Sequence, residues 1–185
     1  MRGYQVKIQT QDTPNPNALK FILNRDVKRF GKVTFTSPEE CVNVPLAQAL
    51  LNIHNATQVH FFENVITVTQ NGDALWEPLE NLIRETILAN MEQHDVDFQA
   101  EKEPKSREHL SPELQKIEEI LDNTIRPGLQ ADGGDVQVLG LDGKTLAIHY
   151  EGACGTCPSS TMGTLQAIEG ILRDEFDADL EVVAV

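Results

Sequence analysis

Aromatic residues and cysteines are scarce in this chain of 185 residues. Only 5% of the residues are aromatic, with one tryptophan and two tyrosines, and there are three cysteines. An odd number of cysteines without the spacing of a disulfide framework indicates a reducing compartment. It argues against a small secreted domain held together by disulfides.

Long apolar runs and targeting features are also lacking. No run is long enough to span a bilayer, so we expect no membrane segment. The N-terminal sequence MRGYQVKIQT alternates like a strand, without the apolar core of a secretory signal or the arginine and serine content of a transit peptide. We therefore expect no secretory signal, and no transit peptide is visible.

Basic residues are few in the second half of the chain. Residues 1–91 hold eight basic and nine acidic residues, whereas residues 92–185 hold seven basic and twenty acidic residues. Nearly all of the net charge of −14 therefore lies in the second half. This asymmetry predicts two units with different surfaces. The acidic half would repel phosphate backbones, so we expect no nucleic-acid binding there. It either keeps the protein soluble or attracts partners with basic patches.

The apolar patterns that are present predict two small α+β domains. Residues 1–91 predict the order β-β-β-α-β-β-α, with a hairpin turn at Glu63-Asn64. Residues 92–110 are charged and weakly periodic, so we interpret them as a linker. Residues 111–185 predict the order α-β-β-α-β, with a hairpin turn at Asp142-Gly143.

Apolar residues repeat at helical spacing in both units, and we assign the longest stripe of the second unit to the core. The first helix of the second unit is expected to start after the cap residue Ser111 and to end at Pro127-Gly128. A later helix is expected to begin at Pro158. The two longest apolar stripes are Leu75, Leu79, Leu82, Ile83 and Ile87 in the first unit, and Met162, Leu165, Ile168, Leu172 and Phe176 in the second.

The sharpest chemical signal is the segment EGACGTCPSS, residues 151–160. It places Cys154 and Cys157 three residues apart between a predicted strand and a predicted helix. Gly152 and Gly155 allow the backbone to curl so that both sulfurs can point at one centre. A helix N-terminus near Cys157 would favour the thiolate, which is the form that binds metals.

Three uses of this cysteine pair compete. A thioredoxin-like dithiol also lies between a strand and a helix, but that fold needs a cis-proline loop after the motif, and no proline follows Pro158. A structural zinc site needs two more ligands, and the chain has no second CxxC or CxxH motif. In the third use, a second copy of the chain supplies two more thiolates, so that four sulfurs surround one iron–sulfur cluster.

The third cysteine, Cys41, stands alone in the first unit. It lies between PEE and an apolar segment, without a partner motif. We interpret it as a buried or partly buried free thiol rather than as a ligand, because unpaired cysteines commonly serve as small apolar residues.

Two long stretches resemble a known family. The sequence LQADGGDVQVLGLDGKTLAIHYEGACGTCPSSTMGTLQAIEGILR is similar to the C-terminal NifU-like domain of the Nfu family. Its marks are RP-L-ADGGD, a hairpin, and G-A-C-x-x-C-P-S-S before a helix. The segments QDTPNPNALKF, PLAQALLNI and FFENVITVT resemble the N-terminal domain of the same family. Together these stretches cover nearly the whole chain apart from the linker.

The resemblance implies a non-enzymatic scaffold or carrier of iron–sulfur clusters. Its cofactor would be a 4Fe–4S rather than a 2Fe–2S cluster, bound between two subunits by Cys154 and Cys157 of each. The implied partners are a second copy of the chain, an upstream assembly scaffold and apo-proteins that accept the cluster. The segment ADGGD, residues 131–135, is assigned a structural role, because the carboxylates of Asp132 and Asp135 suit harder ions. The alternatives are a dithiol redox protein and a zinc-binding adaptor. Eukaryotic members of the family act in mitochondria, so the resemblance implies either a bacterial cytoplasmic protein, which we expect, or a processed protein of the mitochondrial matrix.

Overall fold

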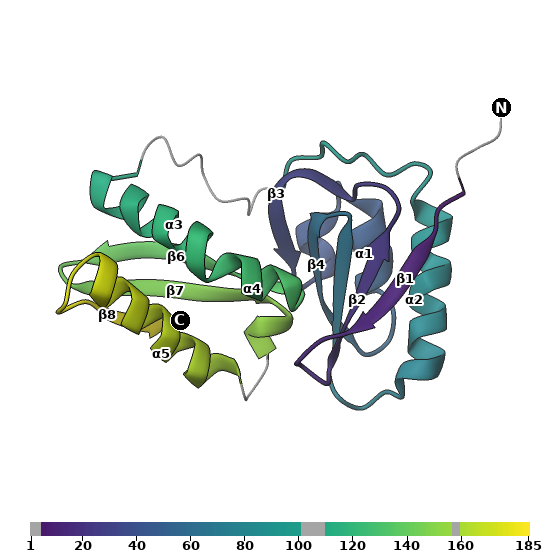
Figure 1. Ribbon diagram of the computed structural model, residues 1–185. Coiled ribbons are helices and arrows are strands. Elements are labelled where there is room, and N and C mark those ends of the chain that lie inside the picture. Colours follow the sequence, from purple (N-terminus) through teal and green to yellow (C-terminus); the bar gives the residue numbers. More distant parts are fainter. Residues whose placement is uncertain (1–4, 101–109, 157–159) are drawn as a thin grey trace. The chain divides into compact units, whose positions relative to one another are not determined.

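The computed structural model describes residues 5–100, 110–156 and 160–185 (Figure 1). The chain divides into two compact units, Met1–Glu103 and Pro104–Val185. We call them unit 1 and unit 2 and describe each by itself. In the described residues, no helix combines the length and the apolar character that crossing a bilayer requires.

Unit 1 is built on a five-stranded antiparallel sheet with the strand order β1-β2-β5-β4-β3. The predicted order β-β-β-α-β-β-α is confirmed. The strands are β1 Ile8–Asp12, β2 Ala18–Leu23, β3 Lys28–Phe35, β4 Ala56–Glu63 and β5 Val65–Gln70. The helices are the 3₁₀ helix η1 Pro38–Cys41 and the α-helices α1 Pro45–Leu51 and α2 Trp76–Asn90. Phe62 pairs with Val65, so Glu63-Asn64 forms the predicted turn.

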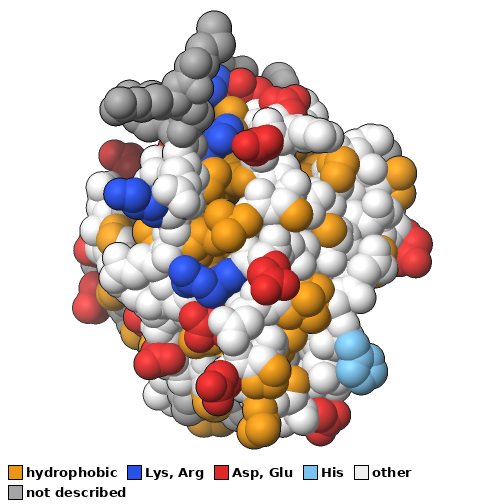
Figure 2. Space-filling model, turned by 90° about the vertical axis from the view of Figure 1, so that its right-hand side faces the viewer, with side chains coloured by type: hydrophobic (Ala, Val, Ile, Leu, Met, Phe, Trp, Pro, Cys, Tyr) orange, Lys and Arg blue, Asp and Glu red, His pale blue; other side chains and the backbone are white. Residues whose placement is uncertain are grey.

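The apolar stripe predicted for α2 is only partly buried. Leu79, Ile83 and Ile87 lie in the core, whereas Leu75 is 80% exposed and Leu82 is 47% exposed. Leu75 precedes the helix, and Leu82 is rotated by about 100° from its neighbour Ile83 around the helix axis. Helical spacing along the sequence thus includes two residues that lie outside the core. Figure 2 shows hydrophobic side chains at the surface, among charged side chains of both signs.

A short segment beyond α2 also packs on unit 1. We call residues 94–98 the strap. Its backbone joins the edge strand through a hydrogen bond from the amide of Arg29 to the carbonyl of Val96, 3.0 Å long. The side chain of Phe98 is 6% exposed and belongs to the core. Part of the region interpreted as a linker, residues 92–110, is thus structured as an extension of unit 1.

The strap is held by aromatic and polar contacts. The Lys28 ammonium, which is buried, donates a hydrogen bond to the Phe98 carbonyl at 2.7 Å and lies 4.5 Å from the centre of the Phe98 ring. The Phe98 ring also contacts Phe61 edge-on, with ring centres 6.2 Å apart. The Nε2 atom of His94 lies 2.7 Å from the carbonyl oxygen of Val27. Aromatic edge contacts and the buried ammonium together fix the path of the chain.

Unit 2 has a three-stranded sheet in the order β6-β7-β8, with β6 antiparallel and β8 parallel to β7. The strands are β6 Gly134–Asp142, β7 Thr145–Gly152 and β8 Glu181–Ala184. The helices are α3 Pro112–Thr124, α4 Arg126–Ala131, the 3₁₀ helix η3 Ala153–Thr156 and α5 Ser160–Glu175. The predicted order α-β-β-α-β is confirmed, with α4 as an additional short helix.

The additional helix corrects the expectation that Pro127-Gly128 ends the first helix of unit 2. Helix α3 ends at Thr124, and Pro127 lies in the first turn of α4. A proline lacks the amide hydrogen that a continuing helix needs, yet it fits the first turn of a new one. The Ser111 hydroxyl caps α3 by accepting a hydrogen bond from the Leu114 amide, as predicted.

The hairpin of unit 2 turns close to the predicted place. Asp142 pairs with Thr145, so the two loop residues are Gly143 and Lys144. Gly143 has φ +59°, in the left-handed region that glycine adopts readily.

The core of unit 2 lies between the sheet and the helices and includes Ile117, Leu121, Val136, Leu146, Ile148, Ile168 and Leu172. Within the stripe predicted for the last helix, Ile168 and Leu172 are fully buried. Met162 is 72% exposed, so its assignment to the core is wrong. It lies in the first turn of α5, and helical periodicity alone does not reveal which turns of a helix extend past their core.

Candidate functional site

The site is centred on Cys154, which follows the end of a core strand. Strand β7 ends at Gly152, whose φ of +62° turns the chain into η3. The side chain of Cys154 is 6% exposed and belongs to the core cluster of unit 2. The second predicted ligand, Cys157, lies outside the described residues.

A glycine turn lies directly against the Cys154 sulfur. A Cβ atom added at Gly134 would be 2.5 Å from Cys154 Sγ, 2.7 Å from the Glu151 carbonyl oxygen and 2.8 Å from the Cys154 amide nitrogen. The preceding Gly133, with φ +81°, accepts a hydrogen bond from the Ala153 amide at 3.1 Å. The ADGGD segment therefore forms a wall of the cysteine site, and Gly134 permits this approach because it has no side chain.

The aromatic neighbour of the site is Tyr150, a buried residue of β7. Burial raises the pKa of the Tyr150 hydroxyl to about 12, and the nearby charge of Cys154 adds to the increase. The hydroxyl therefore stays protonated and neutral near pH 7. Tyr150 therefore adds no charge beside Cys154, which packs with the apolar cluster of unit 2.

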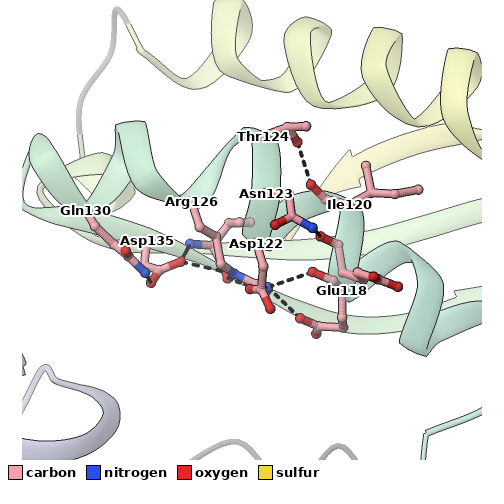
Figure 3. A network of polar contacts seen from close by, with 10 residues as sticks. Glu118, Ile120, Asp122, Asn123, Thr124, Arg126, Gln130 and Asp135 are labelled. Atoms are coloured by element: carbon pink, nitrogen blue, oxygen red, sulfur yellow. Dashed lines mark hydrogen bonds and ion pairs between the residues drawn. The ribbon is translucent and has the colours of Figure 1, made fainter.

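A buried arginine contacts Asp135, the residue that follows the glycine turn (Figure 3). The Arg126 guanidinium forms ion pairs with Glu118 at 2.6 Å, Asp122 at 2.6 Å and Asp135 at 3.4 Å. It also donates a hydrogen bond to the Val136 carbonyl at 3.2 Å. Burial alone would lower the pKa of Arg126, but the charges and hydrogen bonds of these carboxylates outweigh burial and raise it.

The carboxylate of Asp135 is fully buried within this network. Its Oδ2 accepts a hydrogen bond from the Gln130 side-chain amide at 2.9 Å, and its Oδ1 accepts one from the Val136 amide at 2.6 Å. Sequence reasoning missed the network. The available signals were an arginine before the proline that starts α4 and an aspartate directly after two glycines.

The described residues restrict what this site could bind. Among residues 5–100, 110–156 and 160–185, no group of three or more His, Cys, Asp or Glu side chains gathers as a set of metal ligands. The chemistry available at the site is that of a thiolate donor, which suits soft metals and iron–sulfur clusters.

Cys41 belongs to unit 1 and is not part of this site. It is 1% exposed, and its thiol donates to the carbonyl oxygens of Ser37 and Pro38 at 3.5 Å. Burial, assisted by the charges of Glu40 and Glu39, raises its pKa to about 11. The interpretation of Cys41 as a buried free thiol is confirmed.

Two family models match the chain. The model described as "NifU-like domain" matches residues 117–183, and the model described as "Scaffold protein Nfu/NifU N terminal" matches residues 8–94. A solution structure of a NifU-like protein from Saccharomyces cerevisiae aligns with a TM-score of 0.47 and 21% identity, covering 55% of this chain and 91% of that one.

Curated relatives extend the similarity over most of the chain. The Arabidopsis thaliana protein "NifU-like protein 5, mitochondrial" is 33% identical over 191 residues, which cover 94% of this chain and 70% of the relative. The Homo sapiens protein "NFU1 iron-sulfur cluster scaffold homolog, mitochondrial" is 36% identical over 177 residues, which cover 90% and 66%. These relatives are named as mitochondrial proteins, which contradicts the expectation of a bacterial cytoplasmic protein.

Proposed function

Because this chain belongs to the Nfu family of NifU-like proteins, we propose that it is a scaffold and carrier for iron–sulfur clusters and that Cys154 and Cys157 bind the cluster. The observation that carries the proposal is the placement of Cys154. Cys154 follows β7 inside the NifU-like region. Its thiol lies beside a turn in which Gly134 leaves no space for a side chain. The cluster is the cargo of the protein rather than a permanent part of it.

The number of available thiolates supports a cluster shared by two chains. A cubane or rhombic cluster is held by four cysteine thiolates, and the CxxC pair offers two. Cys41 is an unsuitable third ligand, because it belongs to the other unit and its raised pKa disfavours the thiolate. Two copies of the chain would supply four equivalent sulfurs, and we propose a 4Fe–4S cluster at that interface.

Transfer of the cluster would then be a ligand exchange without net oxidation or reduction. Thiolates of an apo-protein replace the four carrier thiolates in turn, and each carrier sulfur is released as a thiolate that can take up a proton. A cluster bound half by each chain is easier to surrender than one enclosed by a single chain. The acidic residues of unit 2 would attract partners with basic surfaces, both the acceptors and an upstream assembly scaffold.

Anaerobic reconstitution with iron and sulfide tests the proposal. The variants are Cys154→Ser and Cys157→Ser, with Cys41→Ser as the matched control. Iron and sulfide counts, Mössbauer spectra and light scattering should give one 4Fe–4S cluster per two chains for the parent protein and for Cys41→Ser. The two other variants should bind none. A stoichiometric cluster in Cys154→Ser would refute the ligand assignment.

The same samples separate the carrier from the two other uses of a CxxC pair. A protein that stays monomeric, takes up no cluster and reduces disulfides would be a dithiol redox protein. A protein that retains only zinc after expression in zinc-poor, iron-replete medium would be a zinc-binding adaptor. Activation of an apo 4Fe–4S enzyme by the loaded protein, under anaerobic conditions with a chelator present, would demonstrate delivery.

A further inference from the structure

Arg126 connects three elements of unit 2 on one side of the cysteine site. Its guanidinium reaches Glu118 and Asp122 on α3, whereas its own backbone begins α4. On the opposite side it reaches the Asp135 carboxylate and the Val136 carbonyl at the start of β6. The start of β6 is therefore held to both short helices through one side chain.

The same end of β6 touches the cysteine turn. Gly134 pairs with Gly152 in the sheet register, and a Cβ atom added to it would be 2.5 Å from Cys154 Sγ. Gly133 accepts the hydrogen bond of the Ala153 amide. Asp135, which Arg126 contacts, thus directly follows Gly134, the residue that lies against the sulfur.

The two glycines make such support necessary. Glycine loses more conformational entropy on ordering than any other residue, and two in succession form a turn with many alternatives to the observed one. Asp135, immediately after the pair, is fixed by Arg126 from one side and by Gln130 from the other. This arrangement restricts the backbone directly where it meets Cys154.

Stability alone is a poor explanation for this network. Burying a guanidinium and carboxylates costs solvation energy, and apolar residues of similar volume commonly stabilise a core as well or better. Arg126 is 5% exposed and Asp135 is fully buried. A network of directional contacts instead defines one geometry among several that an apolar core would permit.

We propose that Arg126 is a positioning residue for the cluster ligand Cys154, and that it acts through Asp135 and the Gly133-Gly134 turn. This inference rests on the proposed function, because it treats Cys154 as a ligand. In this proposal, the contacts of Arg126 with β6 position the cysteine turn, and its contacts with α3 hold the arginine in place.

Two matched variants test this division of roles. Asp135→Asn and Asp122→Asn each remove one negative charge that pairs with Arg126, and each keeps the size of the side chain. The full-length apo-protein is labelled with N-ethylmaleimide under native conditions, and mass spectrometry follows Cys154 and Cys41 separately. Cys41 in unit 1 serves as the internal reference for the reagent.

We expect Asp135→Asn to increase the labelling rate of Cys154 at least tenfold. Asp122→Asn should leave this rate within twofold of the parent protein, because Glu118 still pairs with the guanidinium at 2.6 Å and keeps Arg126 anchored. Cys41 should not change in either variant. Low denaturant concentrations should hardly affect the faster labelling, because it reflects local opening rather than unfolding of unit 2. Equal labelling rates in the two variants, or rates that follow global stability in both, would overturn the proposal.

A milder variant covers the case that Asp135→Asn does not fold. Gln130→Leu removes only the hydrogen bond to Asp135 Oδ2 and should raise the Cys154 labelling rate severalfold. An unchanged rate in a folded Gln130→Leu protein would contradict the proposal.

Reconstitution of the same proteins separates this inference from the proposed function. For the parent protein and Asp122→Asn we expect equal cluster absorption and equal half-lives of cluster loss. The cluster in Asp135→Asn should be lost several times faster. A parent protein that binds no cluster would refute the carrier function, while the labelling rates would still decide whether Arg126 positions Cys154.

Discussion

Replacement of Gly134 by alanine is the sharpest test of the site's geometry. The new Cβ would meet Cys154 Sγ at 2.5 Å and two backbone atoms, the Glu151 oxygen and the Cys154 nitrogen, at 2.7 and 2.8 Å. Carbon atoms pack favourably at about 3.5–4.0 Å, so all three contacts are repulsive. The sulfur could rotate away, but the backbone atoms belong to the sheet and to η3 and can move only together with them.

The cost follows from the balance of two effects. Overpacking of this kind costs about 1–3 kcal/mol, and the loss of glycine flexibility in the unfolded chain returns about 0.4–1 kcal/mol. We expect a net loss of about 2 kcal/mol, with backbone clashes favouring the upper part of the range. For a unit of roughly 80 residues this corresponds to a decrease in Tm of about 8–16 °C.

Calorimetry of the full chain measures this change, with Gly170→Ala as the control. Gly170 lies within α5, and an added Cβ there meets nothing within 4 Å. This control should gain about 0.5–1 kcal/mol from helix propensity. The single tryptophan, Trp76, lies in unit 1, so its fluorescence identifies the transition that should not move. If Gly134→Ala were as stable as the parent protein, the close approach at Cys154 would be refuted.

Three further predictions concern unit 1. Burial lowers the pKa of His94, although the hydrogen bond to Val27 and the charge of Asp95 partly offset this effect. The folded state then binds the proton more weakly than the unfolded state, so unit 1 should lose stability as the pH falls below about 6.5. Urea unfolding at pH 7.5 and 5.5 should show a smaller pH effect in His94→Gln, and an unchanged one would contradict this. Phe98→Ala should cost about 3 kcal/mol in the same assay; a loss below about 1 kcal/mol would show that the strap contributes little. With a pKa of about 11, Cys41 should react with a thiol reagent at pH 8 about 100-fold more slowly than an ordinary exposed cysteine, and comparable rates would refute its burial.

Much of the fold could be predicted because local chemistry determined it. Ser111 before Pro112 indicated a helix start, and Gly143 indicated a hairpin turn that glycine's freedom permits. Element order followed from the periods of the apolar residues in both units. Corrections arose where one signal had two meanings. Pro127 can end one helix or begin the next. Met162 continues the apolar stripe of α5, but it lies in a turn of the helix that extends past the core.

The surroundings of the site could not be predicted in the same way. Cys154 was found from its spacing, but the contact with Gly134 depends on how two strands and a turn meet. A buried arginine is equally invisible, because a charged residue in a sequence predicts exposure. Arg126 is buried only because the fold brings Glu118, Asp122 and Asp135 around it.

The strap has a consequence for dividing the chain into fragments. A fragment that ends at residue 91, where the periodic pattern stops, would lack Phe98 and uncover the aromatic rings of Phe35 and Phe61. Lys28 would lose the carbonyl that its ammonium contacts in the interior. Such a fragment would expose an apolar surface beside the unpaired edge of β3, and both features favour self-association. The smallest autonomous form of unit 1 should therefore extend at least to Ala100.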